Sequence, residues 1–439
     1  MLGVANGRTT ILHPRIALFQ LCRIVALIAL TVGGATTAQA KILARWVQLG
    51  AGERVIARVV TAGACPRVIF DGISAQMSSR SRPQTKFENV KSAVFPVSAC
   101  EVLVPRGANA GIIDGQPLPL PHSDPRRIVI FGDTGCRLLK GDRVQACNDP
   151  KAWPFPAVAR AAAAARPDLV IHVGDYLYRE TPCPAGNAGC AGSPSGYGWD
   201  AWNADFFEPA APLLAAAPWV LARGNHEDCN RAGEGWFRFL DRAPMEKICR
   251  DFSGIFVAQS GTFGLVVVDG AKAADSVQGG NQVVGVLRRQ FDAIKSEIPG
   301  EAWLVTHRPL DAMRPGSKDG VGVVENSIQD KALGPIMPEN VRMFVSGHIH
   351  FFQAVDFGGA RPPQLVVGTG GDNLEPIPPM SLVGLQVNGK TVASSAAYSG
   401  FAYMVWDRSG NSWLGTLFDV NGKPLNHCRL IGKSLTCGR

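Results

Sequence analysis

The chain has 439 residues, of which 46% are hydrophobic and 18% charged, and its formal net charge is +8. This composition is that of an ordinary globular protein and excludes a disordered one, and the length suggests about two domains. The modest positive charge favours anionic substrates in a general way. The sequence has no Lys- and Arg-rich block interleaved with aromatic residues, so nucleic-acid binding is not expected.

The first 40 residues have the parts of a secretory signal. The leader carries three arginines, Arg8, Arg15 and Arg23. An apolar stretch follows at residues 24–32, and small residues end at Ala40. We expect cleavage after Ala40 and export to the periplasm or the extracellular space. The alternative is an uncleaved anchor, but the apolar stretch is too short to span a bilayer comfortably. We therefore expect no stable membrane association of the mature chain.

Cysteine usage agrees with export. The chain has 11 cysteines, and Cys22 leaves with the signal, so an even number remains, which in an exported chain predicts disulfides. Sequence alone does not fix connectivity, and pairing of neighbours along the chain is the simplest scheme. It predicts five bonds, Cys65–Cys100, Cys136–Cys147, Cys183–Cys190, Cys229–Cys249 and Cys428–Cys437. Each would stabilise the fold by restricting the unfolded chain.

Residues 41–122 are predicted to form a small β-sandwich-like domain. Short β-like runs at residues 54–60, 67–70 and 93–97 are separated by Gly, Ser and Pro. Short strands with turn residues between them are typical of a small sandwich. We interpret the Pro-rich residues 117–122 as a stiff linker.

From residue 123 to the end, the pattern changes to that of a second, larger domain. Strand-like apolar runs occur at residues 127–131, 169–173, 219–221, 264–269, 302–305, 341–345 and 364–367. Helical patterns lie between them at residues 156–165, 200–217 and 282–294, and strands return after residue 380. Strands that alternate with helices predict an α/β core with parallel strands.

Five of these runs are followed directly by side chains that bind metals. The candidate ligands are Asp133, Asp175, Tyr178, Asn225, His307, His348 and His350. Ligands bind at the carboxyl ends of strands in open α/β sheets, so these side chains are expected to converge. Carboxylates are hard ligands and imidazoles suit iron, zinc or manganese. Seven such ligands suit two metal ions bridged by one carboxylate, an arrangement that favours in-line displacement at phosphorus.

Asp175 is the better candidate for the bridge, because Gly174 lets the backbone come close and Tyr178 follows in the same block. A tyrosine beside a strongly Lewis-acidic ion such as ferric iron can bind as phenolate. In an extended segment, His348 and His350 would point the same way. In a bend at the strand end, they can diverge to two metals.

Other polar residues receive a structural interpretation or stay open. His172 is expected to be a buried structural histidine, and Asp269 and Asp311 are expected to be turn or capping residues. A thiolate role for Cys136 is outweighed by the expected disulfide. Three residues beside the ligands could either touch substrate or form supporting ion pairs; they are Arg223, Glu227 and Arg308. Aromatic residues at 199, 202, 206 and 207 are expected in a helical core.

Taken in order, the five blocks resemble the metallophosphoesterase (calcineurin-like) superfamily and, within it, the purple acid phosphatases. The resemblance covers about residues 127 to 420. The first block reads Asp133-Thr134-Gly135, and Tyr178 stands where the purple enzymes have their phenolate ligand. The resemblance implies a four-layer α/β/β/α sandwich at residues 123–439, preceded by a small all-β domain as in some family members.

The same resemblance implies the roles of the ligands. Ferric iron would be held by Asp133, Asp175, Tyr178 and His350. A divalent iron, zinc or manganese ion would be held by Asp175, Asn225, His307 and His348. His226 would contact phosphate or protonate the leaving group, and a metal-bound hydroxide would attack in line. Residues 352–354 depart from the family pattern, which affects outer contacts and not the metals.

The sequence thus predicts an exported dimetal phosphatase that hydrolyses small phosphate monoesters. One alternative is a phosphodiesterase on the same dimetal site. Another is a surface binding module that has lost catalysis.

Overall fold

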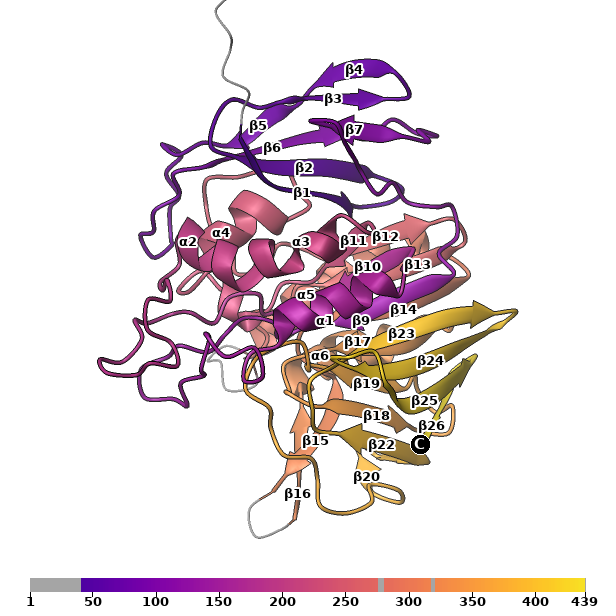
Figure 1. Ribbon diagram of the computed structural model, residues 1–439. Helices are drawn as coiled ribbons and strands as arrows, with labels where there is room; N and C mark the ends of the chain where they lie inside the picture. The colour runs from indigo at the N-terminus through magenta and orange to yellow at the C-terminus, as the bar shows by residue number, and fades with distance from the viewer. Residues whose placement is uncertain (1–40, 275–279, 317–319, 439) are drawn as a thin grey trace, which may run out of the picture. The chain divides into compact units, whose positions relative to one another are not determined.

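The structure is a computed structural model that describes residues 41–274, 280–316 and 320–438. The predicted signal peptide at residues 1–40 lies outside these residues. Within the described ranges, no helix is long and apolar enough to cross a membrane. Two large sheets form the centre of this part of the chain, and helices cover their outer faces (Figure 1).

The first sheet has 11 strands. In spatial order they are β26 (Ser434–Gly438), β25 (Pro424–Ile431), β24 (Ser412–Asp419), β23 (Ala402–Ser409), β9 (Arg127–Phe131), β10 (Leu169–His172), β11 (Trp219–Leu221), β1 (Ile42–Leu49), β2 (Val55–Thr61), β6 (Ser98–Leu103) and β5 (Ser78–Ser81). The strands β9, β10 and β11 run parallel, and β23 lies antiparallel to β9.

The second sheet has 7 strands. In spatial order they are β12 (Phe256–Ser260), β13 (Phe263–Val268), β14 (Glu301–Thr306), β17 (Val341–Ser346), β19 (Gln364–Val367), β18 (Phe352–Asp356) and β22 (Ser394–Tyr398). The four strands β13, β14, β17 and β19 are parallel. Two hairpins stand outside both sheets, β15 (Asp311–Pro315) with β16 (Val321–Glu325) and β20 (Gln386–Val387) with β21 (Lys390–Thr391).

The helices are short and occupy the connections between strands. They are α1 (Phe155–Ala164), α2 (Trp199–Trp202), α3 (Glu208–Leu214), α4 (Gly233–Gly235), α5 (Gly280–Ile294) and α6 (Ser327–Leu333). Two π-helical segments, Asn203–Phe207 and Trp236–Leu240, continue α2 and α4. Single 3₁₀ turns occupy Asn225–Glu227, Lys295–Glu297 and Gly334–Ile336.

Strand alternation explains the layers, because successive side chains point to opposite faces of a sheet. In β9, Ile128 and Ile130 belong to the apolar core between the two sheets, together with residues of β13, β14 and β17. Val129 and Phe131 face the other way, into the core under α1 and α3. Both faces of β9 are therefore buried, as expected for a parallel strand covered on two sides.

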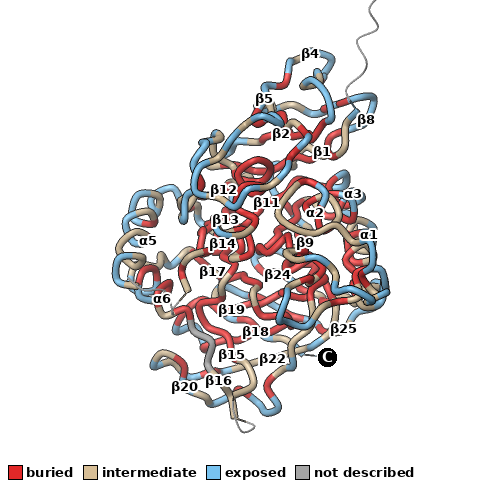
Figure 2. Tube along the Cα trace, turned by 90° about the vertical axis from the view of Figure 1, so that its left-hand side faces the viewer, coloured by how far each residue is buried: buried red, intermediate tan, exposed pale blue. Residues whose placement is uncertain are grey.

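The second sheet shows the same alternation toward its own helices. Val266 and Val268 pack in a core with Leu287 and Phe291 of α5, whereas Leu265 and Val267 face the first sheet. Figure 2 shows the buried strands between α5 and α6 on one side and α1 to α3 on the other. The predicted four-layer α/β/β/α class with parallel strands is confirmed.

The N-terminal region is all β, as predicted. The strands β1, β2, β6 and β5 pack on a second small sheet of β4 (Ile73–Gln76), β3 (Arg67–Phe70), β7 (Gly111–Ile113) and β8 (Gln116–Pro117). The strand β1 also pairs in parallel with β11, where Gln48 lies opposite Trp219. The N-terminal layer and the parallel strands therefore share one sheet. A domain boundary at residue 122 stays a prediction.

One predicted strand is wrong. Residues 93–97 form no strand, although their burial alternates and Phe95 and Val97 are buried. Pro96 has no N–H to donate to a ladder. The carbonyl of Val94 instead accepts from the N–H of Trp199 at 2.9 Å. The segment is extended and bonds to the start of α2, while Phe95 packs on Phe239 and Arg238 of the π-helical segment Trp236–Leu240.

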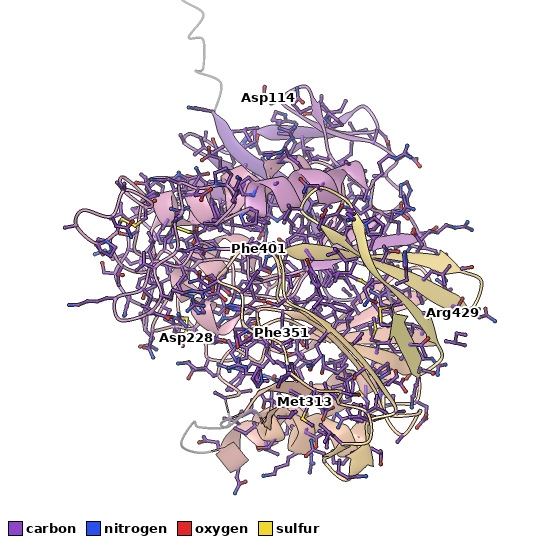
Figure 3. The ribbon with its side chains drawn as sticks, turned by 60° about the horizontal axis from the view of Figure 1, so that its bottom comes forward. Asp114, Asp228, Met313, Phe351, Phe401 and Arg429 are labelled. Carbon is purple, nitrogen blue, oxygen red and sulfur yellow. A yellow bond between two sulfur atoms is a disulfide. The ribbon has the colours of Figure 1, made fainter. Side chains whose placement is uncertain are left out.

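All five predicted disulfides are present and pair neighbours along the chain. Disulfides are drawn in Figure 3 as yellow bonds between sulfur atoms. Cys136–Cys147 closes the loop after β9, and Cys229–Cys249 closes the loop after β11. These two loops also carry predicted ligands, so the disulfides restrict the backbone beside the candidate site.

Candidate metal centre

The seven predicted ligands lie in loops that follow the carboxyl ends of five strands. Asp133 follows β9, Asp175 and Tyr178 follow β10, and Asn225 follows β11; His307 follows β14, and His348 and His350 follow β17. The first three strands belong to one sheet and the last two to the other. The site therefore forms where the same ends of both sheets meet.

The loops bend sharply at three of the candidate ligands. Asp133, Asp175 and His348 have φ values of 58°, 59° and 71°. This left-handed region is unfavourable for residues with a Cβ, and such strain clusters at functional sites. At each of the three residues the backbone therefore turns directly after its strand.

Two glycines make room for the carboxylates. A Cβ at Gly224 would lie 2.0 Å from Asp175 Oδ1, and a Cβ at Gly347 would lie 2.3 Å from Asp133 Oδ2. Neither position can carry a side chain while the carboxylates stay in place. The glycines that precede Asn225 and His348 are therefore requirements of close packing at the site.

One group of candidate ligands centres on the Tyr178 hydroxyl. We call Asp133, Tyr178 and His350 the phenol half. The Tyr178 Oη lies 3.1 Å from Asp133 Oδ1 and 3.2 Å from His350 Nε2. It is also 2.8 Å from Oδ2 of Asp175. One O–H proton serves only one acceptor at a time, and two carboxylates meet at this hydroxyl, so a cation could bind in this half.

The other three ligands, Asn225, His307 and His348, form the amide half. His307 Nε2 lies 3.1 Å from Asn225 Oδ1 and 3.1 Å from Asp175 Oδ2. Ligand atoms of Asp175, His307 and His348 all lie within 4.8 Å of one another, a spacing that could hold a metal ion. Asp175 contacts both halves, which is the position that a bridging carboxylate requires.

Hydrogen bonds at the far side of two imidazoles select the atom that faces the site. His307 Nδ1 lies 2.9 Å from the carbonyl of Val173, and His350 Nδ1 lies 2.8 Å from the carbonyl of Asn373. A carbonyl only accepts, so each Nδ1 carries the proton and each Nε2 is left to face the carboxylates. This outer hydrogen bond is the usual device that orients metal-binding histidines.

The electrostatics of the cluster also call for positive charge. Burial lowers the pKa of His350, but the carboxylates of Asp372 and Asp133 outweigh burial and raise the pKa to about 9. Burial likewise lowers the pKa of His307, and Asp175 reverses the direction so that the pKa is raised. The buried carboxylates thus hold protons on two imidazoles, at the place where a cation would sit.

His226 lies beside the cluster, as predicted. Its backbone N–H donates to Asp175 Oδ1 at 2.8 Å, and its ring lies over Tyr178 with 3.9 Å between centroids. Its Nδ1 is 2.8 Å from Glu180 Oε1. Arg231 contacts both the imidazole and the Glu180 carboxylate. Neither Glu180 nor Arg231 was identified from the sequence, although each follows a predicted ligand by a few residues.

Glu227, left open between two roles, is a buried brace. Its carboxylate accepts backbone N–H groups of four residues in the two loops that carry Asp175 and Asn225; these are Gly224, Asp175, Tyr176 and Leu177. Asp205 does the same from the π-helical segment, accepting from Cys136, Tyr178 and Arg179. Both carboxylates fix loop backbones and so fix the ligands.

The two arginines left open differ in their contacts. Arg223 donates to the carbonyl of Glu227 at 2.8 Å and to Asp269 Oδ2 at 3.1 Å, so it is a structural residue. Arg308 Nη1 lies 2.9 Å from Nε2 of His348 and so adjoins the site. Arg137, which the sequence did not single out, lies over the Tyr178 ring at 4.7 Å from its centroid.

His172, expected to be structural, is fully buried, and its Nδ1 accepts the N–H of Gly174 at 3.2 Å. Asp311 was expected to be a turn or capping residue, but it is instead the first residue of β15 and pairs with the buried Arg361. Gln353, in the segment that departs from the family pattern, bonds the backbone of Met313 and joins β18 to β15. The aromatic residues of the 199–207 segment lie in the helical core.

The chain is similar to known phosphoesterases. The family model described as Calcineurin-like phosphoesterase matches residues 126–352, about half of the chain. No curated protein sequence matches the chain. The fold is similar to that of a purple acid phosphatase from yellow lupin (Lupinus luteus) seeds, with a TM-score of 0.53, 13% identity, and coverage of 87% of this chain and 72% of that one. It is also similar to PhoD, with a TM-score of 0.55, 10% identity, and coverage of 90% and 92%.

Proposed function

The chain belongs to the calcineurin-like phosphoesterase family, and we propose that it is an exported dimetal phosphatase that hydrolyses phosphate monoesters. Family membership implies a metal-binding site. The observation that carries the proposal is the position of Asp175, whose Oδ2 lies 2.8 Å from Tyr178 Oη and 3.1 Å from His307 Nε2. One carboxylate between two groups of ligands suits two ions a short distance apart.

The donor set suits ferric iron in the phenol half and divalent iron, zinc or manganese in the amide half. A phenol beside two carboxylates supplies hard oxygens, whereas the amide half offers two imidazoles and a neutral oxygen. Two bound ions would place positive charge against the ester oxygens and lower the pKa of a bound water. The protein holds the ligand geometry through the carboxylate braces and the outer hydrogen bonds of the imidazoles.

The residues of the chain have separate tasks in this proposal. Asp175 and the six other ligands fix the ions, and Asn225 completes the amide half without adding charge. His226, at the rim of the cluster, contacts a phosphate oxygen or donates a proton to the departing oxygen. The substrate is a small phosphate ester, and nucleic acid is not part of the proposal.

The test uses purified protein loaded with iron and zinc. We expect 4-nitrophenyl phosphate to be cleaved much faster than bis(4-nitrophenyl) phosphate. Faster cleavage of the diester would replace the monoesterase by a phosphodiesterase on the same site. Absence of bound metal together with absence of phosphate release would instead favour a binding module that has lost catalysis.

Export is part of the proposal and has its own support. The five disulfides of the described chain suit an oxidising compartment. N-terminal sequencing of protein recovered from the periplasm or medium should begin at Lys41. Protein that stays in the cytoplasm with its first residues intact would contradict export and leave the catalytic proposal unchanged.

A further inference from the structure

One carboxylate at the rim of the site gathers three polar groups, two from the connection between β11 and α4 and one from the residues before α2. Glu180 Oε1 lies 2.8 Å from Nδ1 of His226. Its Oε2 accepts from Nε of Arg231 at 3.0 Å and from the hydroxyl of Tyr197 at 2.9 Å. Arg231 Nη2 also contacts Oε1.

The imidazole and the guanidinium held by Glu180 lie side by side. Arg231 Nη2 is 2.9 Å from His226 Nε2. The His226 ring lies against Tyr178, and its Nε2 is 3.9 Å from Asp175 Oδ2. The pair therefore borders the cluster on the side where Asp175 joins the two halves.

The exposure of the three side chains differs in a way that suggests their roles. The Glu180 and His226 side chains are 4% and 8% exposed, whereas the Arg231 side chain is 22% exposed. No described residue accepts a hydrogen bond from Arg231 Nη1. The guanidinium is thus anchored by one edge and has N–H donors left for a ligand.

We propose that Glu180 is a positioning residue that holds His226 and Arg231 as a paired arm, and that Arg231 contacts a non-bridging oxygen of a terminal phosphoryl group. This inference rests on the proposed function, because it places the phosphorus between the ions and the arm. A guanidinium held in one orientation by a carboxylate binds phosphate oxygens with little ordering cost. A monoester offers the arm a charged terminal oxygen that a diester replaces with a second alkoxy group, so the arm favours monoesters.

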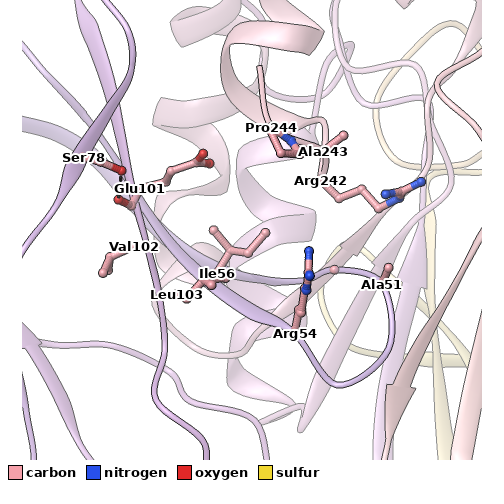
Figure 4. A pocket seen from close by; sticks show the side chains of 11 residues that line it. Ala51, Arg54, Ile56, Ser78, Glu101, Val102, Leu103, Arg242, Ala243 and Pro244 are labelled. Carbon is pink, nitrogen blue, oxygen red and sulfur yellow. Dashed lines mark hydrogen bonds between the residues drawn. The ribbon is translucent and has the colours of Figure 1, made fainter. Parts of the chain in front are cut away.

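A matched control exists elsewhere in the chain. Glu101 also binds two guanidinium groups, with Oε2 at 2.8 Å from Arg58 Nη2 and 3.1 Å from Arg80 Nη1. It lines a cavity of about 240 Å³ between β2, β6 and residues 242–244, shown in Figure 4. None of the candidate ligands lines that cavity. Glu101→Gln therefore measures how much activity is lost when a carboxylate–guanidinium cluster is disrupted at a distance from the candidate site.

The experiment compares Glu180→Gln, Arg231→Lys and Glu101→Gln in the full chain loaded with the same metals. We expect the first two variants to lower kcat/KM for 4-nitrophenyl phosphate about 10- to 100-fold, the range of a lost charge-assisted hydrogen bond. Their dissociation constant for inorganic phosphate should rise about 10-fold, while diester cleavage changes less than about threefold. Arg231→Lys should act mainly through KM, and Glu180→Gln through both KM and kcat, because it also frees His226. Glu101→Gln should change neither kcat/KM for either ester nor the dissociation constant for phosphate.

Metal content decides whether a loss arises from the arm. Variants that keep two ions and lose phosphate affinity support the inference. Equal monoester-to-diester ratios and equal phosphate affinity in wild type, Glu180→Gln and Arg231→Lys overturn it. If the wild type cleaves no ester, the proposed function fails, but phosphate binding to the metal-loaded proteins still tests the inference. Unchanged phosphate affinity in both variants overturns it. Weakened phosphate affinity in both variants supports it.

Discussion

The phenol half and the amide half of the candidate centre are held together by different means. In the phenol half, the Tyr178 hydroxyl has a proton of its own to share among neighbouring acceptors. In the amide half, Nε2 of His307 faces oxygens of Asn225 and Asp175, and its Nδ1 proton is already used by Val173. The phenol half can keep its arrangement through hydrogen bonds, whereas the amide half needs a second proton on His307 or a metal ion.

This difference suggests how the two ions would be bound. An ion in the phenol half must displace the Tyr178 proton, and burial followed by the Asp175 charge raises the pKa of that phenol. Only a strongly Lewis-acidic ion offsets such a cost. An ion in the amide half takes the place of a proton on an imidazole, which a divalent ion does readily. Substitutions confined to one half should therefore separate the two ions.

The largest effect is expected where the halves join. Asp175→Asn removes the one carboxylate that contacts both Tyr178 and His307. We expect loss of both ions and a fall in kcat/KM of about 1,000-fold, because several kcal/mol of transition-state stabilisation depend on the ions. Elemental analysis and monoester kinetics measure this. Retention of two ions per chain would show that the Asp175 carboxylate is not shared between the two ions.

His307→Ala should empty the amide half and leave the phenol half filled. The variant loses the Nε2 that lies against Asn225 and Asp175, and we expect about 100-fold lower kcat/KM with one ion retained. A tyrosinate-to-iron absorption band should persist. Disappearance of that band would mean that the two halves are not separable, and the comparison would fail.

Tyr178→Phe is the corresponding test of the phenol half. The visible band should vanish, and activity should fall about 10-fold, since two carboxylates and His350 still face the ion. Tyr176→Phe is the matched control, because its buried hydroxyl donates to the carbonyl of Ala222 and touches no candidate ligand. A band that survives Tyr178→Phe, or is lost in Tyr176→Phe, would contradict the assignment of Tyr178.

The convergence of the seven candidate ligands was predictable because the signal is local. Each ligand follows an apolar run, and the carboxyl ends of parallel strands meet in space whatever the loops do. Asp133 and His348 are far apart in sequence, yet the N–H of His348 donates to both oxygens of Asp133. They meet because β9 and β17 belong to two sheets that pack face to face and end at the same edge. The five disulfides were predictable for a similar reason, since each joins neighbouring cysteines.

The supporting residues were harder to predict because their partners are decided by tertiary packing. Glu180 and Arg231 carry ordinary loop charges, and nothing in their spacing indicates that they meet on His226. Glu227 was noticed only as a neighbour of Asn225, whereas its role is to bind backbone of the loop after β10. In the N-terminal region, pairing of β1 with β11 joins distant segments of the chain, so the continuous sheet could not be foreseen.

The smallest effect expected is thermal, and it separates the halves without catalysis. Zinc at about 100 times its dissociation constant should stabilise the apoprotein by about 2.7 kcal/mol, which for a chain of this size raises Tm by only a few degrees. Because zinc suits the amide half, His307→Ala should lose this rise and Tyr178→Phe should keep most of it. Differential scanning calorimetry of the apoproteins with and without zinc decides the point. The opposite ranking would assign the divalent ion to the phenol half.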